Sequence, residues 1–244
     1  LAAHFAVFFD PDQMRRYQPD YVSTSQYLDH VRSNPARQAL MEAAELSWTT
    51  QMEDIRMRFV KRDEATLAES LTTAQRAAAI RKPQIDRICK LLVSGEQGRD
   101  SLKEPRWQAG YDLALGRALA TKVRTDGYNT MPALAKQGME FEQARNNTWS
   151  LRSGTEYANS GLEKMARQAT ELLERVQAEH AGTPWAYLAE RELRAPLGWK
   201  WTETYTFVPD PAQMANNNNN NARPRPPRNP TPRQRPPRRD PPPL

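Results

Sequence analysis

Three histidines carry the most versatile chemistry in this sequence, because a neutral imidazole binds metals and exchanges protons near neutral pH. They are His4, His30 and His180, which lie far apart along the chain. None is followed by a metal ligand four residues later, so the spacing of a zincin-type metal helix is absent. We therefore predict no metal-binding residues and expect each histidine at the surface or in a loop.

Two pairs of acids are the next candidates, since general acid–base chemistry needs two carboxylates held in different environments. The pairs are Glu140 with Glu142 and Glu190 with Glu192. Nothing in their sequence surroundings marks them as buried. We expect all four carboxylates on solvent-exposed surfaces, and we predict no catalytic residues.

An enzyme with an unrecognised site remains an alternative, and its candidate residues are Trp107, Tyr111, Asp112 and Arg117. A structure would separate the two interpretations. A concave pocket with converging buried polar groups favours an enzyme, whereas a smooth groove favours binding.

Cysteine and glycine usage gives no sign of a cofactor. A single cysteine, Cys89, excludes an internal disulfide framework and any Cys-rich zinc module. Its apolar neighbours predict a buried, inert thiol. The Gly95-x-x-Gly98 pair lacks the spacing and the Lys-Ser/Thr that hold phosphates, and no G-x-S-x-G nucleophile elbow is present. We predict no cofactor.

The positive charge of the chain is concentrated at its C-terminal end. The net charge is +6, and residues 222–244 hold seven arginines against one acid, so the preceding residues sum to zero. Six consecutive asparagines and ten prolines in residues 216–244 predict a disordered tail. We interpret the arginines as a weak, non-specific binding element for nucleic acid or an anionic surface. They are Arg223, Arg225, Arg228, Arg233, Arg235, Arg238 and Arg239.

Hydrophobic spacing and capping residues predict a mainly helical chain. Asp10-Pro11 and Asn34-Pro35 are helix starts, and Ser23 with Gln26 is a capping box. Pro83 predicts a kink or two abutting helices. The expected helices cover residues 11–17, 24–32, 35–48, 64–93, 107–137, 161–180 and 184–194.

Few strands are expected. Residues 55–61 alternate apolar and polar side chains, which is the period of a half-buried strand. Residues 141–154 lack a helical period and are interpreted as an irregular crossing segment. Aromatic residues at Trp199, Trp201, Tyr205 and Phe207 predict an extended segment that packs on the helices.

These elements predict an irregular helical bundle with at most one or two short strands. The last two helices form a hairpin that resembles one tetratricopeptide-like unit, and we expect this hairpin to pack on the helix over residues 107–124. We divide the chain into an N-terminal lead-in (1–34), a helical domain (35–195), an extended aromatic clasp (196–213) and a disordered tail (214–244).

The apolar stretch from Leu1 to Phe9 is about half as long as the roughly 20 residues that span a bilayer. It also has no initial Met and no basic flank, so we expect no membrane span here and no targeting segment. We expect the chain to be a piece of a longer precursor, whose upstream signal, anchor and compartment stay open.

Several distinctive short motifs are spread over residues 1–207. Together they resemble the C-terminal region of large von Willebrand A domain proteins of planctomycete-type bacteria. The motifs are Phe8-Phe9-Asp10-Pro11, Tyr17 to Ser23, Trp107 to Leu113, Ala120 to Arg124, Asn147-Thr148-Trp149, Gly182 to Ala186 and Pro196 to Trp201.

The resemblance implies an accessory helical region attached to an adhesion or scaffolding module, with the von Willebrand A domain and its metal site upstream of this chain. It assigns no functional residue. Our leading hypothesis is a non-enzymatic interaction or structural domain with an unidentified protein partner. Polyanion binding through the tail and the unrecognised enzyme are the alternatives.

Overall fold

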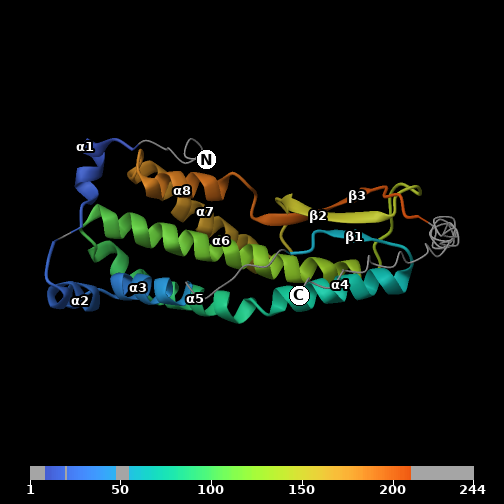
Figure 1. Cartoon of the computed structure of the whole chain (residues 1–244), viewed down its shortest axis with the longest axis horizontal. Coiled ribbons are helices and arrows are strands. Elements are labelled where there is room, and N and C mark those ends of the chain that lie inside the picture. Colours follow the sequence, from blue (N-terminus) through green and yellow to red (C-terminus); the bar gives the residue numbers. More distant parts are fainter. Residues whose placement is uncertain (1–8, 20, 48–54, 210–244) are drawn as a thin grey trace, which may run out of the picture. The chain divides into compact units, whose positions relative to one another are not determined.

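The computed structural model describes residues 9–19, 21–47 and 55–209. Two compact units are separated at Thr206, and of the second only residues 207–209 are described. The first unit is mainly helical and carries a small sheet (Figure 1). The expected tail over 214–244, with its seven arginines, lies outside the described residues, as do His4 and Trp48.

The described helices follow the predicted pattern closely, and Pro83 lies at the start of the second of two abutting helices. They are α1 (Pro11–Met14), the 3-10 helix η2 (Arg15–Tyr17), α2 (Thr24–Arg32), α3 (Pro35–Ser47), α4 (Glu64–Ala79), α5 (Lys82–Ser94), the 3-10 helix η3 (Glu96–Ser101), α6 (Pro105–Ala135), α7 (Ser160–Glu179) and α8 (Pro184–Leu193). None of them is long and apolar enough to cross a membrane.

Side-chain caps define several helix starts, because they satisfy backbone N–H groups that have no partner within the helix. Ser23 and Gln26 form the predicted capping box at α2. Asn159 accepts a hydrogen bond from the backbone N–H of Leu162 at the start of α7, and Thr183 caps α8 in the same way. Local sequence therefore sets these boundaries.

Helix α6 is the centre of the bundle, and α7 packs along one of its faces. The main core joins Leu115, Leu119 and Val123 of α6 to Ala169 and Leu172 of α7. Helix α8 completes the hairpin by packing Ala189 against α7. The predicted packing of the hairpin on the 107–124 helix is confirmed.

The sheet contains three antiparallel strands in the order β1-β2-β3. They are β1 (Arg58–Val60), β2 (Thr148–Gly154) and β3 (Gly198–Thr204). The prediction of at most one or two short strands was therefore wrong. The predicted irregular segment over 141–154 is irregular only up to residue 147, because β2 occupies residues 148–154. The central strand β2 takes its partners from segments far away in sequence, and its own residues lack a clear alternating pattern.

A second core lies between this sheet and the helices α4 and α6 (Figure 1). Phe59 of β1 and Trp149 of β2 are opposite each other in the register, and both are buried. Leu71 of α4 and Tyr128 of α6 complete the cluster from the helical side. The sheet thus covers an apolar helical surface.

Only part of the predicted aromatic clasp is packed. Trp199 is buried, and its indole Nε1 donates a 2.8 Å hydrogen bond to the carbonyl of Arg124. Trp201 contacts Phe59 edge to face. Tyr205 and Phe207 are 59% and 71% exposed, so their predicted burial was wrong. Strand pairing ends at Thr204, and beyond it Thr206 still bonds to Asn147 and Thr148, whereas the rings of Tyr205 and Phe207 remain exposed.

Candidate interaction groove

The four residues proposed for an unrecognised enzyme all lie on α6, but they point in different directions. The Tyr111 hydroxyl is buried and donates to the backbone carbonyl of Leu92. Asp112 is fully buried on the side of α7. Trp107 and Arg117 line two different pockets on the opposite side. The four side chains therefore form no common site.

Asp112 is held by two arginines. Arg99 donates from Nε and Nη2 to the carboxylate at 2.7–3.1 Å, and Arg175 of α7 lies 3.1 Å from it. The hydrogen bonds to Asp112 raise the pKa of Arg99 against the opposing effect of burial. Because both lone-pair sides of the carboxylate are occupied, Asp112 has a structural role in joining η3, α6 and α7.

His180 lies in a loop, one of the two predicted environments, but it is not at the surface. It follows α7 in the loop before α8, yet only 3% of its surface is exposed. Its Nδ1 lies 2.9 Å from the Tyr17 hydroxyl, and burial lowers its pKa. The Tyr17 ring stacks on Trp185 at 5.3 Å between centroids. His30 is exposed, as predicted.

Of the four paired glutamates, three are exposed as expected and one, Glu192, is largely buried. Glu140, Glu142 and Glu190 are exposed, as predicted. The Glu192 side chain is only 16% exposed, because it forms ion pairs with Arg117 and Arg124 of α6. These ion pairs place the Glu192 carboxylate in the contact between α6 and α8. Sequence spacing does not predict them, because the arginines lie on a different helix.

Cys89 is a buried thiol, as predicted. Its Sγ lies 3.2 Å from the carbonyl of Ala118, and burial raises the pKa to about 11. A protonated, enclosed thiol is a poor nucleophile. Within residues 9–19, 21–47 and 55–209, no group of three or more His, Cys, Asp or Glu side chains could hold a metal ion.

A long hollow on the described surface follows the face of α6 that points away from α7. Two adjoining pockets share Leu40 of α3, Gly110 of α6 and Trp185 of α8 as lining residues. A Cβ atom built on Gly110 would lie 3.4 Å from Leu40 Cδ2 and 3.8 Å from Trp185 Nε1. Gly110 therefore lies at the waist of one groove with two lobes.

The aromatic lobe has a volume of about 300 Å³ and lies at the start of α6. Trp107 and Tyr27 contribute ring surfaces with centroids 6.3 Å apart. The guanidinium of Arg37 lies over the Trp107 ring, 5.5 Å from its centroid. Arg37 also pairs with Glu104 at 2.5 Å. Charged groups in this lobe thus fix the position of Trp107.

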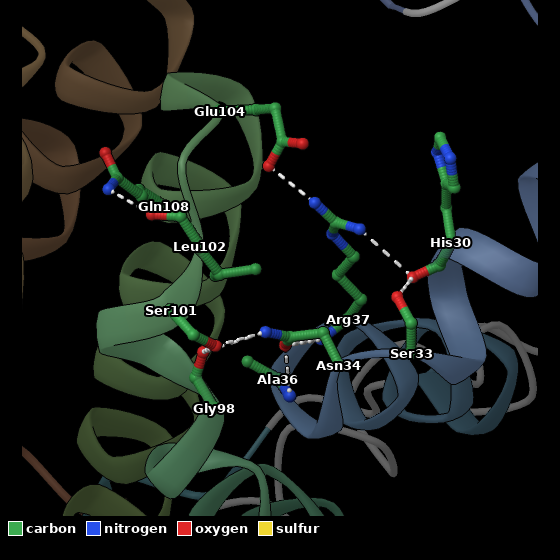
Figure 2. Close-up of polar contacts among 10 residues, drawn as sticks. All are labelled: His30, Ser33, Asn34, Ala36, Arg37, Gly98, Ser101, Leu102, Glu104 and Gln108. Carbon is green, nitrogen blue, oxygen red and sulfur yellow. Dashed lines mark hydrogen bonds and ion pairs between the residues drawn. The ribbon is translucent and has the colours of Figure 1, made fainter.

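A polar network fastens α3 to η3 beside this lobe (Figure 2). Asn34 accepts hydrogen bonds from the backbone N–H groups of Ala36 and Arg37 and donates to Gly98 and Ser101. Arg37 extends from α3 to the carbonyl of His30 and to Glu104. Burial opposes ionisation of Glu104, but the Arg37 contact outweighs it and lowers the pKa.

Gly98 permits this fastening, because a Cβ there would lie 2.8 Å from the backbone nitrogen of Ala36. The close approach of η3 to the first turn of α3 therefore requires glycine. Both glycines of the Gly95-x-x-Gly98 pair pack closely against α3. These contacts hold the α3 wall of the groove in place.

The apolar lobe has a volume of about 600 Å³. Its floor on α6 consists of Leu113, Ala114 and Ala118, and its walls come from α3, α5 and α8. The small side chains of the two alanines leave the pocket deeper than larger residues would. The wall residues are Leu40, Ala43, Ala44, Ser47, Ile85, Ile88, Leu92 and Trp185, and Arg117 and Thr121 complete the lining.

Sequence reasoning missed this groove, although it identified most of the helices that build it. The signal was present in the spacing of Trp107, Gly110, Ala114, Ala118 and Thr121, which places small and apolar residues on one face of α6. Comparisons with protein-family models, curated proteins and solved structures give no match for this chain.

Proposed function

We propose that this chain is a non-enzymatic helical domain that binds a protein partner in the groove along α6. The observation that carries the proposal is the open apolar lobe between α3, α5, α6 and α8. Apolar grooves between helices commonly accept a helix from another protein. In keeping with the motifs over residues 1–207, we propose that the domain is an accessory region of a von Willebrand A domain protein.

The placement of polar groups favours binding over catalysis. In the apolar lobe, Ser47, Arg117 and Thr121 are the polar lining residues, and none of the three is fully buried. The buried charges of the bundle, such as Asp112, are already neutralised by arginines on the other side of α6. A groove of this kind provides contact area rather than a reacting group.

The α7–α8 hairpin supports the same proposal. Ala189 of α8 packs against Leu173 and Val176 of α7, which is the close approach expected for a tetratricopeptide-like unit. Helix hairpins of that type present concave surfaces to peptide partners when they stack. We propose that α6 replaces the neighbouring repeat and that Trp185 of α8 contributes the edge of the binding surface.

The proposal is tested by selecting binders from a displayed library of amphipathic helical peptides. The selection uses the wild-type chain and the Ala114→Glu variant, which places a carboxylate in the floor of the apolar lobe. Ala114 is half-buried beside open space, so the variant is expected to fold. Selected peptides should bind the wild type and lose at least about tenfold in affinity for Ala114→Glu.

Ala77→Glu is the matched control, because Ala77 is an exposed alanine within α4, away from the groove. It should leave binding unchanged. Recovery of no helical binders, or of binders that ignore Ala114→Glu, would contradict the proposed function. Equal thermal midpoints of the two variants and the wild type exclude unfolding as the cause.

The sequence supports one second candidate, polyanion binding through residues 222–244, because the surplus charge of the chain resides there. Phosphate contacts by arginine are non-specific and weaken as salt rises. The full chain should therefore bind single-stranded DNA at low salt, and a truncation after Ala215 should not. Equal binding by both proteins, or no binding by either at low salt, would remove this candidate.

A further inference from the structure

The two ends of the groove carry positive charge. Arg106 lies in the lining of the aromatic lobe, and Arg117 lies in the lining of the apolar lobe. The two arginines are eleven residues apart on α6, which is close to three helical turns. They therefore lie on the same face of the helix, roughly 16 Å apart at about 1.5 Å per residue.

At both positions the guanidinium groups outnumber the carboxylates among the residues that the structure describes. Among the described residues that line the aromatic lobe, Glu104 is the one carboxylate, and it is already paired with Arg37. Arg106 is exposed and has no ion pair among the residues that the structure describes. At the apolar end, Glu192 is shared between Arg117 and Arg124. Each end therefore has one positive charge in excess.

The walls of the groove favour a helix over an extended peptide. A strand needs partners for its backbone N–H and C=O groups, and an apolar surface supplies none. The apolar lobe is built from α3, α5, α6 and α8, whose own backbone groups are bonded within each helix. A helical ligand satisfies its backbone internally and offers only side chains to Leu40, Ala114 and Ile88.

We infer that the partner's helix presents an apolar stripe flanked by two acidic side chains about three turns apart, which pair with Arg106 and Arg117. This inference rests on the proposed function and adds the chemistry of the ligand. The charges set orientation and register, while the apolar stripe covers Ala114, which lies between the two arginines, and Ala118 just beyond Arg117.

Three synthetic 18-residue helical peptides test the inference with the full chain. All share one leucine stripe and differ only at two positions eleven residues apart, which carry Glu, Gln or Lys. Fluorescence anisotropy should rank their affinities in the order Glu, Gln, Lys, with about a tenfold difference between the first and the last at low salt. The difference should shrink as salt rises, since these charges are exposed.

Arg106→Glu is the most informative variant, because the side chain is exposed near the first turn of its helix and acidic residues are tolerated there. It should weaken the Glu peptide and strengthen the Lys peptide, each by several-fold. Lys164→Glu is the control, since Lys164 is an exposed basic residue on α7. It should change neither affinity.

The outcomes separate the two levels of the proposal. Equal binding of all three peptides, abolished by Ala114→Glu, would overturn the acidic ligand and leave the groove as a binding site. No binding by any peptide, or binding that Ala114→Glu leaves intact, would count against the groove itself. Dimerisation in sedimentation that Ala114→Glu abolishes would make a second copy of this chain the occupant and overturn the inference.

Discussion

The two sides of α6 use the same residue type for opposite purposes. On the side of α7, which we call the sealed face, a Cβ at Gly116 would lie 2.9 Å from Leu173 Cγ. On the groove side, which we call the open face, a Cβ at Gly110 would meet its nearest neighbour only at 3.4 Å. The glycine on the sealed face allows two helices to approach more closely than a Cβ would permit, whereas the glycine on the open face has enough space for one.

This difference shows that burial within one helix follows from its neighbours rather than from its own composition. The sealed face contains Asp112, Gly116 and Val123, all of which are buried and fully packed. The open face contains Gly110, Ala114 and Ala118, which are only half-buried although they are equally small or apolar. Substitutions placed on the two faces should therefore have contrasting effects.

The largest contrast is expected from leucine truncation. Leu172→Ala removes a side chain buried in the main core and should lower the free energy of unfolding by about 2–5 kcal/mol. Leu40→Ala removes a half-buried groove residue and should cost only about 1 kcal/mol. Denaturant unfolding measures both. A cost for Leu40→Ala equal to that of Leu172→Ala would break the comparison.

Loss of the buried carboxylate is the next test. Asp112→Asn leaves Arg99 and Arg175 without their shared anion and should cost about 2–3 kcal/mol, below the usual range because the Arg175 side chain is 40% exposed. Glu163→Gln, which breaks an exposed pair with Arg167, should change stability by less than about 0.5 kcal/mol. Similar values for the two would show that the sealed face tolerates unpaired charge.

The two glycines themselves sharpen the comparison. Gly116→Ala should destabilise the fold by about 1–3 kcal/mol, because the new methyl group overlaps Leu173. Gly110→Ala should stabilise it by about 0.5–1 kcal/mol, because alanine favours the helix and meets no clash. The thermal midpoints should therefore shift in opposite directions. A shift of the same sign at both positions would contradict the distinction.

The smallest effect is a pH dependence from His180. Because its pKa in the folded chain is lowered, the unfolded chain takes up a proton first as the pH falls. Stability is therefore retained above the ordinary pKa of about 6.5 and declines as the pH falls through it toward the lower folded value. His180→Gln should flatten this part of the pH profile of the melting temperature. An unchanged profile would assign the decline to other groups.

The sequence predicted the helices because their signals are local. Ser23, Asn34 and Thr183 mark helix starts by hydrogen bonds to residues within the next turn. The apolar residues of α7 between Leu162 and Val176 recur at helical spacing, and they are buried as that spacing predicts. Such features need no knowledge of distant segments.

The strands and the groove depend on distant contacts and were predicted poorly. Trp149 pairs with Phe59 on one side and Glu203 on the other, and neither partner can be read from residues 141–154. The burial of His180 depends on Tyr17, 163 positions earlier in the chain. Residue spacing places small and apolar side chains on the open face of α6, but it does not show whether another helix covers that face.

The β1-β2-β3 order places a constraint on how the chain acquires its structure. The strands come from residues 58–60, 148–154 and 198–204, so the sheet closes loops of considerable length. Loop closure costs entropy before any pairing is gained, and non-local pairing slows folding. Trp199 packs on Gly127 and Tyr128 in the folded chain. During synthesis, these two residues therefore lack this contact until Trp199 has been added to the chain. This delay leaves the apolar surface of α4 and α6 as the segment of the nascent chain most in need of protection from aggregation.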